Sequence, residues 1–430
     1  MERSRVTQRL CVINVVGLTP RLAEHAPRIS AIATPRAWRS PLPAVTCTSQ
    51  ATMLTGLSPA EHGIVANGWY YADTQEIRFW QQANSLIEGE KLYEGLETAK
   101  LFWWFNQSAP VRWSVTPKPH YGSDGSKSFG IIDHTDCRLE ERLGPFPFFS
   151  FWGPGAGLAC SEWIAQAAAI TLRENQPQLT LVYLPHLDYD YQRLPTHDLE
   201  RVREVDRCAG EVIDAAREVD AEVVVVSEYG LVPVTTPVMI NQALRQRGWL
   251  TVRDGPYGEM LMPGESRAFS VVDHQLAHIY INDRELTGEV QAVVEELPGV
   301  SRVVPPEELQ LHHARSGQLI ALAEPDAWFA YYYWLDDRRA PDFARCVDIH
   351  RKPGYDPCEL FMTSRLRAAG RLAQKKLGLR YRMDVIPLDP TLVRGSHGLH
   401  PDPQDGPVIV GQDPPADMLD FKAYIRARLL

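Results

Sequence analysis

The chain has 430 residues, of which 44% are hydrophobic, and its 54 acidic and 44 basic residues give a net charge of -10. Such a chain is long enough to bury a large core, and its acidity argues against non-specific binding to a nucleic-acid polymer. The polar first residues and the lack of about 18 unbroken apolar residues predict neither a signal peptide nor a transmembrane helix.

The seven cysteines are scattered without paired spacing. In a chain without a secretion signal, this pattern is typical of reduced thiols. We therefore expect a cytoplasmic protein without a membrane partner, and its oligomeric state stays open.

Three near-continuous apolar runs predict strands that are buried on both faces. They cover Leu10–Leu18, Leu179–Leu184 and Glu222–Val226, and amphipathic helices are expected at Ala159–Glu174 and Asp198–Val219. Strands that alternate with helices indicate an α/β fold with a doubly wound, mostly parallel central sheet. The expected alternation continues with helices at Ile240–Arg247 and Thr287–Glu296 and strands at Phe269–Val272, Ala277–Ile281, Gln318–Leu322 and Trp328–Trp334.

Two stretches break the alternation, and we predict a single domain over residues 1–430 with two insertions. Residues 69–151 are rich in aromatic side chains, proline and glycine, which favours a cap over one sheet edge. Its aromatic residues either line a pocket or pack among themselves. Residues 340–390 form the second expected insertion, with a basic helix at Arg365–Leu377.

The segment from Pro43 to Asn67 contains the best candidate nucleophile. An extended stretch turns at small hydroxyl residues into an expected helix at Ala51–Leu57. A hydroxyl at the first turn of a helix faces free N–H groups and the positive end of the helix dipole, a place that suits phosphate. We hypothesise that Thr46 attacks a phosphoryl group, while the neighbouring Cys47 is expected to be a buried thiol.

Ligands of open parallel sheets lie at the carboxyl ends of the strands. Polar residues follow each predicted central strand, with Asp188 after the second and Glu228 after the third, and His397 lies in a late glycine turn. We therefore expect Thr46, Asp188, Glu228 and His397 to converge on one site.

The motifs at these places resemble the alkaline phosphatase superfamily. They are P-x-x-T, T-G-x-x-P-x-x-H-G-I-x-x-N, an aspartate after a strand, S-[acid]-x-G and a late G-x-H-G. The nucleotide pyrophosphatase/phosphodiesterase branch is most similar, together with a bacterial set of uncharacterised proteins. The resemblance implies that Thr46 attacks phosphorus between two metal ions and that Asn67 binds a phosphoryl oxygen.

The chain departs from the family pattern at three metal-binding positions. Val16 stands where the family has an aspartate at the end of the first strand, and Gln192 and Tyr229 stand where it has histidines. Asn14 shares a strand face with Val16 but lies about 6–7 Å further back.

The remaining donors predict one or two divalent ions. Asp188, Glu228, Thr46 and His397 are good donors, and Gln192, Tyr229 and Asn14 are weak ones. Because oxygen dominates this set, Mg²⁺, Mn²⁺ or Ca²⁺ fits better than Zn²⁺, although the identity stays open. The alternative is a site that has lost its metal.

A second group of polar residues is a candidate for binding phosphate oxygens. Asp348, His350 and Lys352 share one face if their segment is extended, and we predict His350 and Lys352 as substrate-binding residues. The alternative is a solvated loop held by Pro353 and Gly354.

Other polar residues are weaker candidates. Asp190 would face the same side as Asp188 in an extended segment, and His186 is expected to be a loop residue. His274 and His278 would lie about 13 Å apart in a strand and so would not share a metal ion. Asp273 beside them completes the pattern that suggests a metal site, but we expect His278 to be structural and leave His274 open.

These features predict a metal-dependent hydrolase of small phosphate esters with Thr46 as nucleophile. The phosphodiesterase/nucleotide pyrophosphatase type is favoured over a monoesterase by the resemblance alone. Two alternatives remain. One is a phosphotransferase or mutase on the same fold, and the other is a metal-poor pseudoenzyme that binds a ligand or a protein partner.

Overall fold

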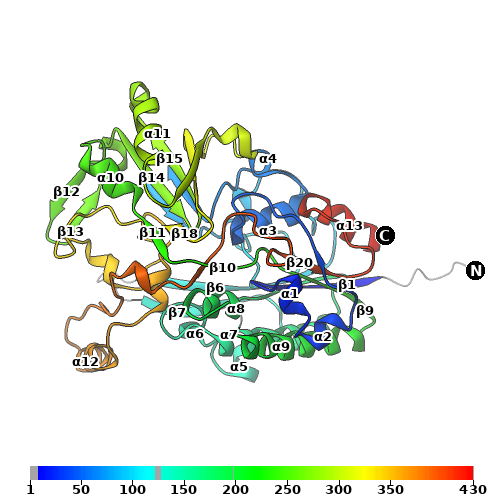
Figure 1. The fold of residues 1–430 in the computed structure, drawn as a ribbon. Coiled ribbons are helices and arrows are strands. Elements are labelled where there is room, and N and C mark those ends of the chain that lie inside the picture. Colours follow the sequence, from blue (N-terminus) through cyan, green and yellow to red (C-terminus); the bar gives the residue numbers. More distant parts are fainter. Residues whose placement is uncertain (1–7, 122–126, 197, 430) are drawn as a thin grey trace, which may run out of the picture.

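A computed structural model describes residues 8–121, 127–196 and 198–429. Its largest sheet has eight strands in the order β2-β20-β9-β1-β8-β5-β6-β7, and the five from β9 to β6 run parallel (Figure 1). The strands are β9 (Ala221–Val226), β1 (Arg9–Val15), β8 (Leu179–Leu184), β5 (Thr98–Leu101) and β6 (Trp113–Tyr121), with β2 (Arg36–Ala37), β20 (Val408–Val410) and β7 (Lys127–Asp133) at the two edges.

Strand β1 lies in the middle of this sheet because nearly all its side chains are apolar and buried. It pairs with β8 on one side and β9 on the other, so that Asn14 lies between Tyr183 and Val226. The predicted doubly wound, mostly parallel α/β fold is confirmed. The carboxyl ends of β1, β8 and β9 lie side by side, which is what positions the site.

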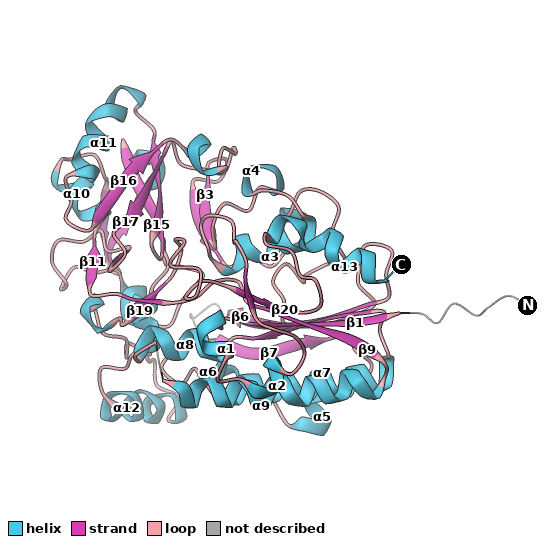
Figure 2. Ribbon diagram, turned by 45° about the vertical axis from the view of Figure 1, so that its right-hand side comes forward, coloured by secondary structure: helices cyan, strands magenta, loops and turns pink. Residues whose placement is uncertain are grey.

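Helices cover both faces of the central sheet (Figure 2). One face carries α7 and α9, and the other carries α3 and α13. Among the described residues, no helix combines the length and apolarity needed to cross a membrane. The helices are α1 (Pro20–Ala23), α2 (Pro27–Ser30), α3 (Thr46–Thr55), α4 (Pro59–His62), α5 (Leu139–Leu143), α6 (Phe148–Phe151), α7 (Leu158–Asn175), α8 (His186–Arg193), α9 (Leu199–Glu218), α10 (Ile240–Gln246), α11 (Thr287–Glu295), α12 (Arg365–Lys376) and α13 (Phe421–Leu429).

A second, antiparallel sheet lies beside the first and has its own apolar core. The later strands were expected to continue the parallel alternation, but they pair with one another, because a tight turn at His274 folds β14 directly back on β15. The strand order is β14 (Ala268–Asp273), β15 (Leu276–Ile281), β17 (Leu319–Ala323) and β16 (Val300–Val304).

The remaining strands form two-stranded sheets, and short 3₁₀ helices lie in the connections. The pairs are β3 (Gly68–Tyr71) with β4 (Glu76–Phe79), β10 (Val232–Pro233) with β19 (Gly395–Ser396), β11 (Thr236–Val238) with β18 (Ala327–Phe329), and β12 (Val252–Gly255) with β13 (Gly258–Leu261). The 3₁₀ helices are η1 (Asn84–Leu86), η2 (Pro263–Glu265), η3 (Arg284–Leu286), η4 (Pro306–Leu309), η5 (Asp342–Arg345), η6 (Pro357–Leu360), η7 (Pro390–Leu392) and η8 (Met418–Asp420).

The expected cap over residues 69–151 differs from the structure, since β5, β6 and β7 extend the central sheet. Strand β5 has only four residues and contains a buried lysine, Lys100, so it lacks the apolar run that marks β1 and β8. Within residues 340–390 the described chain has no strand and carries α12 on its outside. The division into one domain with two insertions stays a prediction.

Candidate active site

Four segments meet at the carboxyl edge of the central sheet, as the sequence predicts. The Thr46 Oγ1 atom lies 3.1 Å from the Tyr229 hydroxyl, and the Tyr229 ring stacks on His397 with ring centres 3.5 Å apart. His397 Nε2 is in turn 3.7 Å from Asp188 Oδ1. Together with Glu228, the neighbour of Tyr229, these residues form one buried cluster.

Thr46 is the first residue of α3, and it is only 3% exposed. The helix begins at Thr46 and ends at Thr55, where the left-handed Gly56 caps it, rather than beginning at Ala51. The earlier start follows from Val45, whose extended backbone precedes the first turn and whose carbonyl accepts from Ser49 N–H. Of the first-turn N–H groups that suit an anion, that of Cys47 is occupied by Asn67, which leaves those of Thr46 and Thr48.

Asn67 lies over the start of α3 and is fixed by three hydrogen bonds. Its Oδ1 accepts from Cys47 N–H at 3.0 Å, while its own N–H and Nδ2 donate to the two Asp273 oxygens at 2.7 and 3.1 Å. Burial raises the pKa of Asp273 to about 7, and the two Asn67 donors oppose that rise. One Nδ2 hydrogen of Asn67 is left for a ligand.

Glu228 is fully buried beside Thr46 and accepts two short hydrogen bonds on one oxygen. Asn14 Nδ2 and Gln50 Nε2 each donate to Oε1 at 2.6 Å, whereas Oε2 has no partner in the described residues. Burial raises the pKa of Glu228 to about 8, and the donors Gln50, Asn14 and Thr46 oppose the rise. Asn14 is therefore connected to the site by its hydrogen bond to Glu228.

The buried Glu228 carboxyl is expected to make the stability of the folded state depend on pH. Its pKa of about 8 lies above the value of about 4.3 in an unfolded chain, so between these pH values only the folded state holds the proton. The folded state is therefore expected to lose about 1.4 kcal/mol per pH unit from this group as pH rises from about 5 to 8. Urea unfolding in chelator at three pH values, with Glu228→Gln as comparison, measures this slope, and an equally steep slope in the variant would contradict it.

Asp188 lies on a helix, not in the extended loop that we expected after β8. In α8, residues four apart share a face, so Gln192 Nε2 donates to Asp188 Oδ2 at 2.9 Å, and Tyr355 donates to Gln192 Oε1 at 2.7 Å. The helix also turns Asp190 away from Asp188 and onto Arg193, at 2.8 Å. Burial raises the pKa of Asp188 to about 7, and its Oδ1 has no hydrogen-bond partner among the described residues.

His397 is held in a stack of aromatic rings. Its Nδ1 lies 2.7 Å from the Ala44 carbonyl, which leaves Nε2 aimed at Asp188. Tyr229 covers one face, and His274 lies on the other with ring centres 3.6 Å apart. Burial lowers the pKa of His397 to about 3, so the ring is neutral and its Nε2 is a donor atom for a metal ion.

The two other histidines near the second sheet have different surroundings. His274 stands at the β14–β15 turn with a φ of 59° and stacks on Tyr355 as well as His397, so it belongs to the edge of the site. His278 lies in β15, where its ring nitrogens meet the Val65 carbonyl and the Gly317 N–H. These bonds are structural, as expected. His186, at the start of α8 and not in a loop, is buried with both ring nitrogens unpartnered in the described chain.

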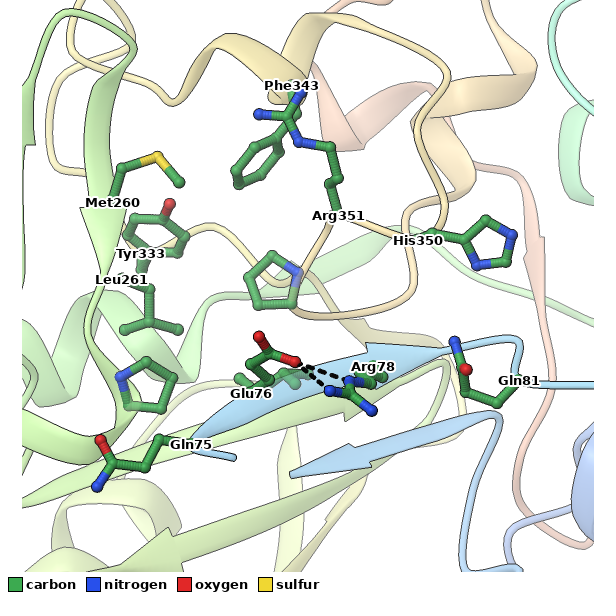
Figure 3. Close-up of a pocket in the computed structure, with 13 residues that line it drawn as sticks. Gln75, Glu76, Arg78, Gln81, Met260, Leu261, Tyr333, Phe343, His350 and Arg351 are labelled. Atoms are coloured by element: carbon green, nitrogen blue, oxygen red, sulfur yellow. Dashed lines mark hydrogen bonds and ion pairs between the residues drawn. The ribbon is translucent and has the colours of Figure 1, made fainter. Parts of the chain in front are cut away.

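His350 and Lys352 make no described contact with Thr46 or its neighbours. Lys352 Nζ is buried between Asp356 and Glu359, 2.7 Å from each. His350 Nδ1 lies 3.2 Å from the Phe79 carbonyl, and the ring lines a pocket of about 490 Å³. In Figure 3, His350 and Gln81 lie at one end of this pocket and Met260 and Leu261 at the other. Since none of the four converging residues lines it, this pocket and the Thr46 cluster are separate places.

Aromatic residues cover the Thr46 cluster. Trp104 N–H donates to Gln50 Oε1 at 2.8 Å, and the Trp104 ring meets the half-exposed Trp80 with centres 4.9 Å apart. Trp80 also contacts Tyr355, with centres 6.0 Å apart. Trp80 and Trp104, which belong to the range 69–151, thus reach the edge of the candidate site.

The cluster offers two facing donors to a metal ion. Asp188 Oδ1 and His397 Nε2 are buried, unpartnered and 3.7 Å apart, a spacing that one shared ion fits. Glu228 Oε2 is a further free donor, but Val16 adds none, and the described residues contain no group of three or more His, Cys, Asp or Glu side chains able to hold an ion. Asp188 and His397 are therefore the two residues here whose donor atoms could share an ion.

The chain matches one protein family over most of its length and shares its fold with several solved structures. Residues 10–356 match the family of type I phosphodiesterases / nucleotide pyrophosphatases. No curated protein matches the chain. Among solved structures, phosphonoacetate hydrolase from Sinorhizobium meliloti 1021 is 16% identical with a TM-score of 0.63, over 99% of this chain and 96% of that one. Murine ectonucleotide pyrophosphatase/phosphodiesterase 5 is 13% identical with a TM-score of 0.57, over 98% and 95%. At these identities the likeness shows the fold.

Proposed function

The chain belongs to the type I phosphodiesterase / nucleotide pyrophosphatase family and is a phosphoric ester hydrolase, and on that premise we propose that Thr46 is its nucleophile and a small phosphate diester its substrate. The observation that carries this proposal is the position of Thr46 Oγ1. It stands on the first turn of α3, 3.1 Å from Tyr229, inside the cluster of Asp188, Glu228 and His397.

The proposed reaction has two displacements. The Thr46 oxygen bonds to phosphorus as the bond to the leaving alcohol breaks, and water then cleaves the phosphothreonine. Glu228, once ionised, is the acceptor for the Thr46 proton, because its Oε2 is buried and without a partner in the described residues. The Thr46 and Thr48 N–H groups at the start of α3 and the remaining Nδ2 hydrogen of Asn67 stabilise the charge on the phosphoryl oxygens.

A divalent ion held by Asp188 and His397 would supply a Lewis acid for the phosphoryl oxygen. Tyr229 then positions Thr46 by its hydroxyl and His397 by its ring. The preference for diesters comes from the family. The neighbours were solved with small phosphorus-containing ligands, which are the phosphonate phosphonoacetate in phosphonoacetate hydrolase and AMP in murine ectonucleotide pyrophosphatase/phosphodiesterase 5. A cytoplasmic location remains part of the proposal.

The experiment that tests this function combines metal analysis with assays. The purified protein is expected to bind at most one divalent ion per chain and to hydrolyse a bis-aryl phosphate faster than a mono-aryl phosphate with Mn²⁺, Mg²⁺ or Zn²⁺. Asp188→Asn should release the ion. Two bound ions would contradict the single site, and no turnover with any ion would favour a pseudoenzyme that binds a ligand.

A further inference from the structure

Helix α12 lies on the outside of the molecule and has no buried residue. In Figure 1 it projects away from both sheets. Its half-buried residues are Ala368, Arg371 and Gln374, which are spaced by three and mark the side that faces the protein. All its other residues are exposed.

The apolar stripe of α12 faces outward. At 3.6 residues per turn, Leu366, Ala373 and Leu377 lie within about 40° of one another and on the side opposite Arg371. Leu366 is 86% exposed and Leu377 is 74% exposed. An amphipathic helix of a globular protein normally turns this stripe toward the core, whereas in α12 it faces away from the rest of the chain.

Exposed apolar side chains are concentrated here. Among the described residues eleven large hydrophobic side chains are exposed, and five of them lie between residues 362 and 379. The five are Met362, Leu366, Leu372, Leu377 and Leu379. Such a concentration of exposed apolar side chains in one segment is typical of an interaction surface.

The same segment is strongly basic in an acidic protein. Residues 365–382 contain seven Arg and Lys residues and no Asp or Glu, while the whole chain carries a net charge of -10. Asp384 pairs with Arg367 and Arg371, and Asp342 lies 3.7 Å from Arg382. Over the described chain no ion pair engages the other four, which are Arg365, Lys375, Lys376 and Arg380.

We propose that α12 docks on an anionic lipid surface. Leucines on the outer face with basic residues beside them form the pattern of a helix that lies in a membrane interface. An anionic lipid surface repels a protein with a net negative charge. The local positive charge of this segment would instead attract the surface. This inference is independent of the phosphodiesterase proposal. It also departs from our expectation of no membrane partner, which rested on the lack of a spanning segment.

Vesicle co-sedimentation tests the proposal. The intact protein should bind vesicles of phosphatidylglycerol and phosphatidylcholine, but not pure phosphatidylcholine, and 300 mM salt should weaken the binding. The pair Arg365→Gln and Lys376→Gln should lower the affinity at least about tenfold, as should Leu366→Ser with Leu377→Ser. Because these residues are exposed, thermal unfolding of each variant should match that of the parent protein.

Matched controls lie elsewhere on the surface. Leu335→Ser removes a leucine that is 52% exposed, and Arg217→Gln removes an exposed arginine. Both should bind vesicles like the parent protein. Absence of binding to anionic vesicles, or binding that the α12 variants do not change, would overturn the proposal. So would a dimer in sedimentation velocity that Leu366→Ser with Leu377→Ser dissociates, since a second copy would then cover the stripe.

Discussion

Thr46→Ala is expected to lower kcat/KM for a bis-aryl phosphate by at least about 10³-fold, because the substitution removes the proposed nucleophile. The fold should persist, since Thr46→Ala removes only a small side chain that contacts Tyr229 and Glu228. Thr46→Ser keeps a hydroxyl and should retain measurable turnover. Steady-state kinetics with the optimal ion, together with a search for phosphothreonine by mass spectrometry, measures both effects.

The same helix offers a matched control. Thr48 lies two residues further along α3, fully buried, and its hydroxyl has no partner among the described residues. Thr48→Ala therefore tests the loss of a buried hydroxyl in α3 without touching the cluster, and its activity should stay near that of the parent enzyme. If Thr46→Ala and Thr48→Ala are equally active, Thr46 is not the nucleophile and water attacks phosphorus directly.

Strands β1, β8 and β9 were predictable because their apolar runs are local features of the sequence. Strand β8 has the predicted bounds, and β9 begins one residue before the predicted start. The second sheet was not predictable in the same way. The turn between β14 and β15 places His274 in the left-handed region. A glycine or asparagine, which would have indicated such a turn in the sequence, is not present at this position. Periodicity identifies β14 and β15 as strands but does not say which strands they pair with.

The residues at the centre of the site were predictable from their types and their order along the chain. Thr46, Asp188, Glu228 and His397 lie together because the carboxyl ends of parallel strands share one edge. The supporting residues were missed or given other roles. Helical spacing from Thr46 would have pointed to Gln50, one turn further on the same face of α3. Tyr355, which binds Gln192 from a segment 163 residues away, left no local signal.

The largest expected effect on stability belongs to a buried ion cluster. Lys352→Met should lower the free energy of unfolding by about 3–5 kcal/mol, because it leaves two buried carboxylates without their cation. Lys352 Nζ is 2.7 Å from both Asp356 and Glu359, and its side chain is 1% exposed. Burial opposes the charge, but the two carboxylates outweigh it and raise the pKa of Lys352. Urea unfolding at pH 7 measures the loss.

Two further variants separate this structural role from the substrate-binding role that the sequence predicts. The triple variant Lys352→Met, Asp356→Asn and Glu359→Gln removes all three charges, so it should recover part of the lost stability. Lys375→Met, at an exposed position of α12, should change stability by less than about 0.5 kcal/mol. If Lys352→Met instead leaves stability unchanged and raises KM alone, Lys352 binds the substrate and the buried cluster adds little to the fold.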